Sequence, residues 1–211
     1  MKPDHSHADN NGHMTWPRGP SVLKRFPSPR PVPSLSEELR ASGIELLPAT
    51  AADIPRLRAL YRASRLAELL TAPWPADRKR AFLDDQFALQ HDHFLKVYRK
   101  GDYRLIRLND GPIGRIYFDR SGRDWALIDI LLAADSRGKG IGSALIRWLQ
   151  QSAVATGAER LRLHVARDNP RARKLYECLG FLEIPVAGAT SATHTAMAWS
   201  GNRALAGAQL R

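Results

Sequence analysis

The sequence predicts an α/β or mixed α+β fold. Short apolar runs that alternate with polar residues or continue uninterrupted, as strands do, are interspersed with segments whose apolar residues recur at helical spacing. A glycine-rich stretch follows one of the strand-like runs, Trp125 to Ala133, and leads into a helical segment. Because strand, turn and helix in this order form a standard unit of domains with a helix-covered sheet, we expect one sheet with helices packed on it.

The first half of the chain contains three predicted strands and two predicted helices. These elements are a strand over 44–49, helices over 50–70 and about 77–98, and alternating strands over 103–110 and 112–120. The last two strands meet at Asn109-Asp110-Gly111, a sequence typical of a tight hairpin.

The second half begins with the nearly continuous apolar run at 125–133, which is typical of a central strand covered on both faces. The helix after the glycines ends at Gly157, and strands follow over 160–166, 181–188 and 193–200. Between the first two of these strands lies a helix with Asn169 at its cap, Pro170 at its first position and Gly180 just beyond its end.

Length and composition favour one domain. With 211 residues, 44% of them hydrophobic, the chain is long enough for a sizeable core and short for two domains. Residues 1–40 are rich in Pro, Ser, His and Asn without apolar periodicity, which predicts a disordered leader. We expect the folded domain over 41–200 and a C-terminal tail over 201–211.

The net charge of +11 indicates an anionic partner: a nucleic acid, a membrane surface or a phosphorylated small molecule. The lone Cys178 excludes an internal disulfide and a cysteine-based zinc site. The sequence begins without the apolar segment of a signal peptide and contains no run of about 18 apolar residues. We therefore expect a cytoplasmic protein with no membrane partner.

The stretch DSRGKGIGSAL, residues 135–145, predicts an anion-binding turn. At the start of a helix, backbone N–H groups lack intrahelical acceptors and the helix dipole is positive, so a phosphate is stabilised there. Arg137 and Lys139 add positive charge. The alternative is a tight strand-to-helix connection with solvated cations.

Two other phosphate-binding motifs fit this stretch less well. A P-loop needs a Ser or Thr after its lysine, but Gly140 follows Lys139. A Rossmann-type dinucleotide site needs the spacing G-x-G-x-x-G and an acid about 20 residues later. Here the spacing is G-x-G-x-G, and Asp168 lies 26 residues after Gly142.

Two segments resemble the GCN5-related N-acetyltransferase (GNAT) superfamily. Residues 137–142 match its [RQ]-x-x-G-x-[GA] pyrophosphate turn, and residues 169–181 match its N-x-x-A-x-x-[LF]-Y-x-x-x-G-F segment. The resemblance extends from Ile44 to about Ser200. It implies a mixed, mostly antiparallel sheet of about six or seven strands flanked by helices, with acetyl-CoA as co-substrate and no metal.

By this resemblance, the pyrophosphate of the cofactor lies on the N–H groups of Gly138 to Ser143. The pantetheine arm pairs with the strand backbone at Ile130 to Leu132, where an N–H near Leu132 polarises the thioester carbonyl. The implied cofactor-binding residues are Ile130, Leu131, Leu132, Arg137, Gly138, Lys139, Gly140, Ile141, Gly142, Ser143, Asn169, Ala172 and Tyr176.

The resemblance also assigns catalytic roles. Tyr176 is expected to protonate the departing thiolate, since a phenol of pKa about 10 can donate to a thiolate whose thiol has a pKa near 8.5. The alternative is that Asn169 is only a helix cap and Tyr176 only a core aromatic. Asp129, an acid in an apolar strand, is the candidate base for the acceptor amine or a structural hydrogen-bonding residue.

Substrate-binding candidates are His164, also a second candidate base, and Trp74 in the loop between the first two helices. The function predicted is direct acetyl transfer from acetyl-CoA to a primary amine of a small molecule, peptide or protein. The alternatives are a non-catalytic acyl-CoA-binding regulatory module and a Rossmann-type dinucleotide-binding protein. A nucleic-acid partner is disfavoured because the chain lacks a basic stripe interleaved with aromatics. A homodimer is left open.

Overall fold

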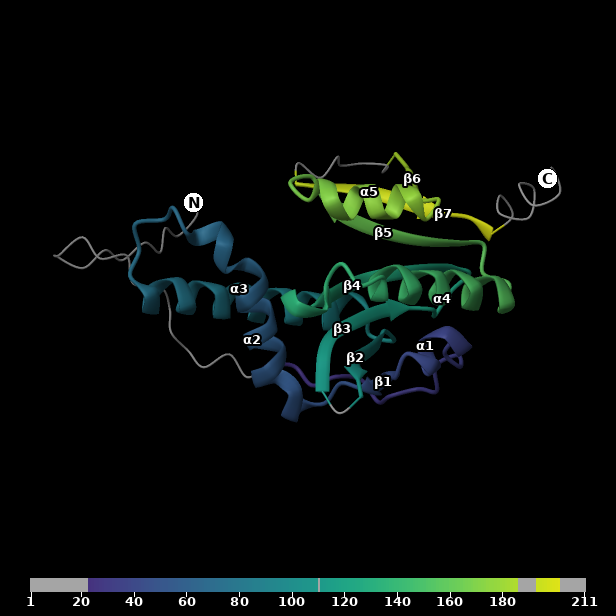
Figure 1. The fold of residues 1–211 in the computed structure, drawn as a ribbon, viewed down its shortest axis with the longest axis horizontal. Coiled ribbons are helices and arrows are strands. Elements are labelled where there is room, and N and C mark those ends of the chain that lie inside the picture. The colour runs from purple at the N-terminus through teal and green to yellow at the C-terminus, as the bar shows by residue number, and fades with distance from the viewer. Residues whose placement is uncertain (1–22, 110, 186–192, 202–211) are drawn as a thin grey trace, which may run out of the picture.

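The computed structural model describes residues 23–109, 111–185 and 193–201. Its seven strands form one sheet in the order β1-β2-β3-β4-β5-β7-β6, and every adjacent pair is antiparallel except β4 and β5 (Figure 1). The strands are β1 (Ile44–Pro48), β2 (Asp102–Leu108), β3 (Gly111–Asp119), β4 (Asp124–Leu132), β5 (Arg160–Ala166), β6 (Leu182–Glu183) and β7 (His194–Trp199). The predicted mostly antiparallel sheet is confirmed.

The helices occupy the predicted places, with one addition near the N-terminus. They are α1 (Glu37–Ala41), α2 (Ile54–Arg65), α3 (Ala76–Val97), α4 (Ile141–Ala155) and α5 (Pro170–Cys178), with short 3-10 turns η1 (Ala51–Asp53), η2 (Leu66–Leu69) and η3 (Ala134–Ser136). The end of the predicted strand 181–188 and residues 202–211 of the predicted tail lie outside the described residues.

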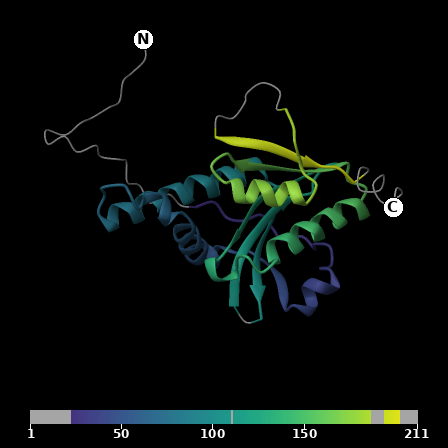
Figure 2. The same ribbon diagram turned by 45° about the horizontal axis from the view of Figure 1, so that its top comes forward.

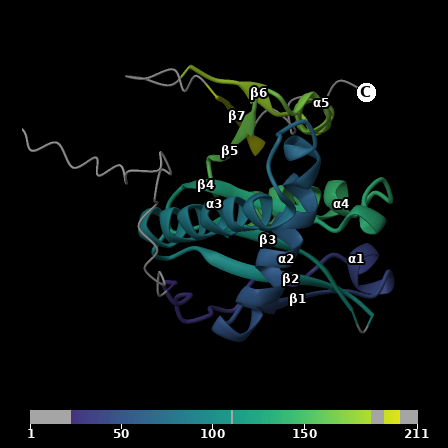
Figure 3. The ribbon, with the colours of Figure 1, turned by 90° about the vertical axis from the view of Figure 1, so that its left-hand side faces the viewer.

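Helices cover both faces of the sheet. Neighbours in a strand point to opposite faces, and accordingly Ile106 and Leu105 of β2 belong to different hydrophobic clusters. The first cluster joins one face to α4, α5 and α1, whose packing beside the strands is seen in Figure 2. The second joins the other face to α2 and α3, which lie in front of the sheet in Figure 3.

The two central strands β4 and β5 pair only at their beginnings. Their parallel register runs from Asp124 opposite Arg160 to Leu127 opposite Leu163. Beyond that point β4 continues alongside β3 to Leu132, while β5 continues alongside β7 to Ala166. The β3–β4 register shifts between Tyr117 and Phe118, which leaves Ile128 as an extra residue. The last residues of β4 therefore have a strand partner on one side only.

The prediction of a disordered leader is wrong for residues 23–40. These residues include the first four residues of α1, whose Leu39 is only 2% exposed. The preceding segment, residues 23–36, which we call the N-terminal strap, packs Leu23 and Phe26 on the second cluster and Val32 and Leu35 on the first. A proline-rich extended segment reaches these sites without helical or strand periodicity, and for this reason the sequence pattern did not show it.

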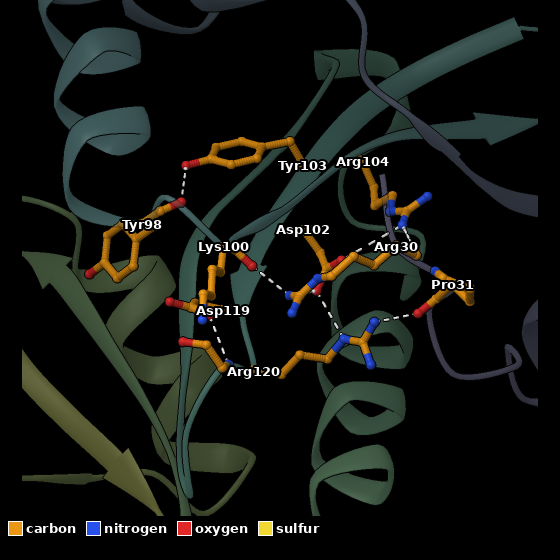
Figure 4. Close-up of polar contacts among 10 residues, drawn as sticks. Arg30, Pro31, Tyr98, Lys100, Asp102, Tyr103, Arg104, Asp119 and Arg120 are labelled. Carbon is orange, nitrogen blue, oxygen red and sulfur yellow. Dashed lines mark hydrogen bonds and ion pairs between the residues drawn. The ribbon is translucent and has the colours of Figure 1, made fainter. Parts of the chain in front are cut away.

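Asp102 is an electrostatic anchor for the strap (Figure 4). Its side chain is 1% exposed and accepts from Arg30 of the strap at 2.8 Å and from Arg120 at 2.9 Å, with Arg104 at 3.7 Å. Arg104 and Arg120 also donate to the strap carbonyls of Arg30 and Pro31. One buried carboxylate thus holds the strap to β2 and to the end of β3.

We predict that Asp102→Asn lowers the free energy of unfolding by about 3 kcal/mol, because it leaves a buried guanidinium, Arg104, without its counter-charge. Urea denaturation measures the change. The control is Glu45→Gln, which removes the partner of Arg107 in an exposed pair at 3.5 Å, where we expect less than about 1 kcal/mol. Equal effects of the two substitutions would contradict the anchoring role.

Candidate active site

The glycine turn has the backbone that its sequence requires. Gly138 and Gly140 have φ of 75° and 79°, a region where residues with a Cβ are strained. Gly140 is the N-cap of α4, so the turn leads directly into the helix. The N–H groups that follow are at a helix start, where an α-helix offers no intrahelical acceptor. The turn is exposed, and an anion can approach these donors.

Three cations surround the turn. Arg137 donates its Nε to the carbonyl of Leu132 at 2.8 Å and thereby ties the turn to the end of β4. Lys139 is exposed between the two left-handed glycines. Arg171 of α5 was missed by sequence reasoning, yet its Nη2 lies 3.8 Å from the position a Cβ on Gly138 would take. Its place beside Ala172 in the N-x-x-A segment was the only available signal.

Asn169 begins α5 as predicted. Its Oδ1 accepts from the N–H of Ala172 at 3.0 Å, which confirms the cap. Because the cap uses only the oxygen, the Nδ2 group can still serve a ligand. Ala172 is partly buried and packs on the first cluster. The structure therefore explains both residues as parts of a helix start, and their contact with a cofactor stays a prediction.

Tyr176 is buried at 8% exposure on the first-cluster side of the sheet, with its ring edge-on to Phe181 at 5.8 Å. Burial, followed by the charge of Asp129, raises the pKa of Tyr176 to about 12. The phenol is therefore protonated at neutral pH.

Asp129 lies on the second-cluster side of the sheet, the other side from Tyr176. In the β3–β4 register it pairs with Tyr117 of that cluster. Its Oδ2 accepts from Nε of Arg115 at 2.7 Å, and its side chain remains 20% exposed. Burial disfavours the charge of Arg115, but the charge and hydrogen bond of Asp129 together with Tyr117 and Tyr61 outweigh it, and the pKa of Arg115 is raised. Of the two interpretations of Asp129, the structural hydrogen-bonding residue agrees with this ion pair, and the role of base stays a prediction.

His164 follows the last β4–β5 pair, so it borders the point where the strands part. His164 is exposed. Leu163 points to the first-cluster side of the sheet, so His164 points to the second-cluster side, where Asp129 also lies. Desolvation, then the charges of His194 and Arg162, lower the pKa of His164. Trp74 packs edge-on against Phe82 at 5.4 Å and lies under Arg78, so its contacts are with α3. Its role in substrate binding stays a prediction.

Most predicted site residues lie on β4 and β5 near the point where these strands part, or on the turn and the helix that follow them. The backbone of Ile130 to Leu132, which has no strand partner on the β5 side, leads to the glycine turn at the end of β4. Tyr176 lies on the first-cluster side of the sheet, and Asp129 and His164 lie on the second-cluster side. Within the described residues, no group of three His, Cys, Asp or Glu could hold a metal ion. In that same part of the chain, no helix is both long and apolar enough to cross a membrane.

Comparison with known proteins agrees with this geometry. Residues 63–181 match the Acetyltransferase (GNAT) family, and the chain belongs to it. It is 39% identical over 74 residues to the thialysine N-epsilon-acetyltransferase of Bos taurus, covering 34% of this chain and 44% of that protein. It is 30% identical over 98 residues to the mycothiol acetyltransferase of Corynebacterium jeikeium, covering 46% of this chain and 24% of that protein. The chain thus spans less than half the length of these curated relatives.

Solved structures share the fold. A PaiA N-acetyltransferase from Thermoplasma acidophilum in complex with coenzyme A superposes with a TM-score of 0.56 at 16% identity, over 74% of this chain and 98% of that one. A spermidine N-acetyltransferase from Vibrio cholerae in complex with CoA and spermine gives 0.52 at 19% identity, over 78% and 99%.

We predict that Gly114→Ala weakens CoA binding about tenfold and destabilises the fold by about 1–3 kcal/mol. Gly114 faces the end of β4, and a Cβ there would lie 2.4 Å from the carbonyl oxygen of Leu131. The strand segment must shift to admit it. Calorimetric titration with CoA measures the affinity. Gly122→Ala, where a Cβ meets nothing within 4 Å, is the control. Unchanged affinity in Gly114→Ala would mean that CoA does not contact the end of β4.

Proposed function

We propose that this protein transfers an acetyl group from acetyl-CoA to a primary amine in a single direct step. The observation that carries the proposal is the parting of β4 from β5 after Leu127 and Leu163, with the glycine turn at the end of β4. A strand edge and an anion-binding turn in this order fit an extended ligand that ends in a pyrophosphate.

In this proposal, the N–H groups of Gly138 to Ser143 hold the pyrophosphate, and Arg137, Lys139 and Arg171 neutralise its charge. Asn169 adds a polar contact from α5. The backbone of Ile130 to Leu132 binds the pantetheine arm, and the Leu132 N–H polarises the thioester carbonyl. Acetyl-CoA, when bound, supplies the activated acyl group.

Tyr176 faces the departing sulfur in this arrangement. Full transfer of its proton is costly, because a pKa of about 12 exceeds that of a thiol by about 3.5 units, or about 5 kcal/mol. We therefore assign to Tyr176 a hydrogen bond to the sulfur as negative charge develops there. This refines the simpler role of proton donor that the sequence suggested.

On the acceptor side, Asp129 receives the amine and helps remove its proton, with His164 at the border of the same opening. The lowered pKa of His164 favours a neutral imidazole, which can accept a proton at neutral pH.

The spermidine enzyme among the structural neighbours acts on a polycation, but the charges here favour a monoamine. Three carboxylates around α2, α3 and β4 already have arginine partners, namely Asp129 with Arg115, Glu68 with Arg65 and Asp84 with Arg62. Further ammonium groups of a polyamine would compete with these arginines for the same carboxylates. We therefore propose one cationic amine per acceptor, in a small molecule or a peptide.

We predict that the wild-type protein releases free CoA thiol from acetyl-CoA in the presence of a monoamine, and that Tyr176→Phe lowers kcat about 100-fold without weakening acetyl-CoA binding. Thiol release is followed over a panel of amines, amino acids, peptides and polyamines. Higher kcat/KM for spermidine than for every monoamine would overturn the acceptor class. Binding without turnover of any amine would favour a regulatory module.

A further inference from the structure

Arg115 is a charged residue in the interior beneath the proposed acceptor site. Its side chain is 2% exposed and belongs to β3, diagonally across the β3–β4 register from Asp129. The guanidinium donates Nε to Asp129 Oδ2 at 2.7 Å and Nη2 to Gln90 Oε1 of α3 at 2.9 Å. It also lies 5.9 Å from the ring centre of Phe87 and 5.2 Å from that of Tyr117.

Fold stability alone gives little reason for such an arrangement. Burying an ion pair removes two charges from water, and apolar side chains of similar volume often stabilise a core as well or better. The contacts of Arg115 instead restrict its geometry, since two hydrogen bonds in different directions and two aromatic rings hold the planar guanidinium in one orientation. The orientation of the guanidinium in turn fixes its partner.

The partner is the carboxylate of Asp129, which Arg115 engages through one oxygen. The Asp129 side chain keeps 20% of its surface exposed, so the carboxylate is not closed off from solvent, and it lies on β4 just beyond the last β4–β5 pair. With Oδ2 held by Arg115, the other oxygen, Oδ1, is the one available to an acceptor. Without the arginine, the side chain could rotate and present either oxygen, or neither.

We propose that Arg115, oriented by Gln90, is a positioning residue that fixes Asp129 with Oδ1 toward the nitrogen of the acceptor. This inference rests on the proposed function, in which Asp129 receives the amine. Arg115 itself touches neither the acceptor nor the cofactor in this arrangement. Its contribution to turnover therefore passes entirely through Asp129.

A double-mutant cycle tests this dependence. Arg115→Met, Asp129→Asn and the double variant are compared with the wild type for kcat and KM with acetyl-CoA and the best monoamine of the panel. We expect Arg115→Met to lower kcat about 10- to 100-fold with KM for acetyl-CoA unchanged, and Asp129→Asn to lower it about 100-fold. The double variant is expected to match Asp129→Asn, since the arginine then has no carboxylate to position.

Two further variants keep the test decisive if Arg115→Met does not fold. Gln90→Met removes the group that accepts from Nη2 of Arg115 and is expected to lower kcat about 3- to 10-fold. Arg115→Lys keeps the positive charge but not the forked guanidinium, and it is expected to retain more activity than Arg115→Met but less than the wild type. Arg107→Met is the matched control, because Arg107 pairs with Glu45 on the β1–β2 side of the sheet. It is expected to leave kcat within twofold of the wild-type value.

The outcomes separate this inference from the proposed function. Arg115→Met is made in the wild-type and in the Asp129→Asn background, with Gln90→Met in its place if Arg115→Met does not fold. If kcat falls by the same factor in both backgrounds, Arg115 is purely structural and the inference is overturned. The same holds if Asp129→Asn leaves kcat unchanged in an active enzyme. A wild-type protein that binds acetyl-CoA and acetylates no amine overturns the proposed function, and the positioning role with it.

Discussion

The site depends on the short pairing between β4 and β5. The two strands are parallel and joined through α4, so they begin side by side, but only four residue pairs hold them together. Each strand then satisfies its backbone on its outer side, β4 with β3 and β5 with β7. The extra residue Ile128 bends β4 at this point. Because Gly114 has no Cβ, β3 can lie close to the carbonyl of Leu131 on the bent part of β4. In the proposed function, the strand edge left without a partner is the surface that binds the extended, amide-containing arm of acetyl-CoA.

Charge pairing accounts for much of what surrounds this opening. A chain with a net charge of +11 has many more cations than carboxylates, and both the buried Asp102 and the partly buried Asp129 pair with arginines. Asp102 gathers three and fixes the N-terminal strap, whereas Asp129 takes one, Arg115, and keeps part of its surface exposed. The cations at the glycine turn instead face outward. The same excess of arginine thus stabilises the strap at one end of the sheet and, in the proposed function, neutralises the pyrophosphate at the other.

Local sequence patterns predicted most of the fold, including the glycine turn and the start of α5. The caps of α5, the left-handed glycines of the turn and the alternating strands are determined by neighbours within a few residues, and such features can be inferred from sequence. The strap was missed because its anchor pairs Arg30 with Asp102, 72 residues apart, and because its apolar residues have no regular period. The environment of Asp129 was missed for a similar reason. Its partner Arg115 comes from β3, and Gln90, which accepts from Arg115, comes from α3, so only the β3–β4 register and helix packing bring them together.

The central claim is that one ligand spans the unpaired edge of β4 and the glycine turn. Hydrogen exchange of backbone amides, measured with and without CoA, tests it most directly. The account predicts slower exchange in two separate segments on CoA binding, residues 130–132 and residues 138–143, with little change in β1 and β2. Binding of CoA without protection of either segment, or with protection of the turn alone, would contradict it.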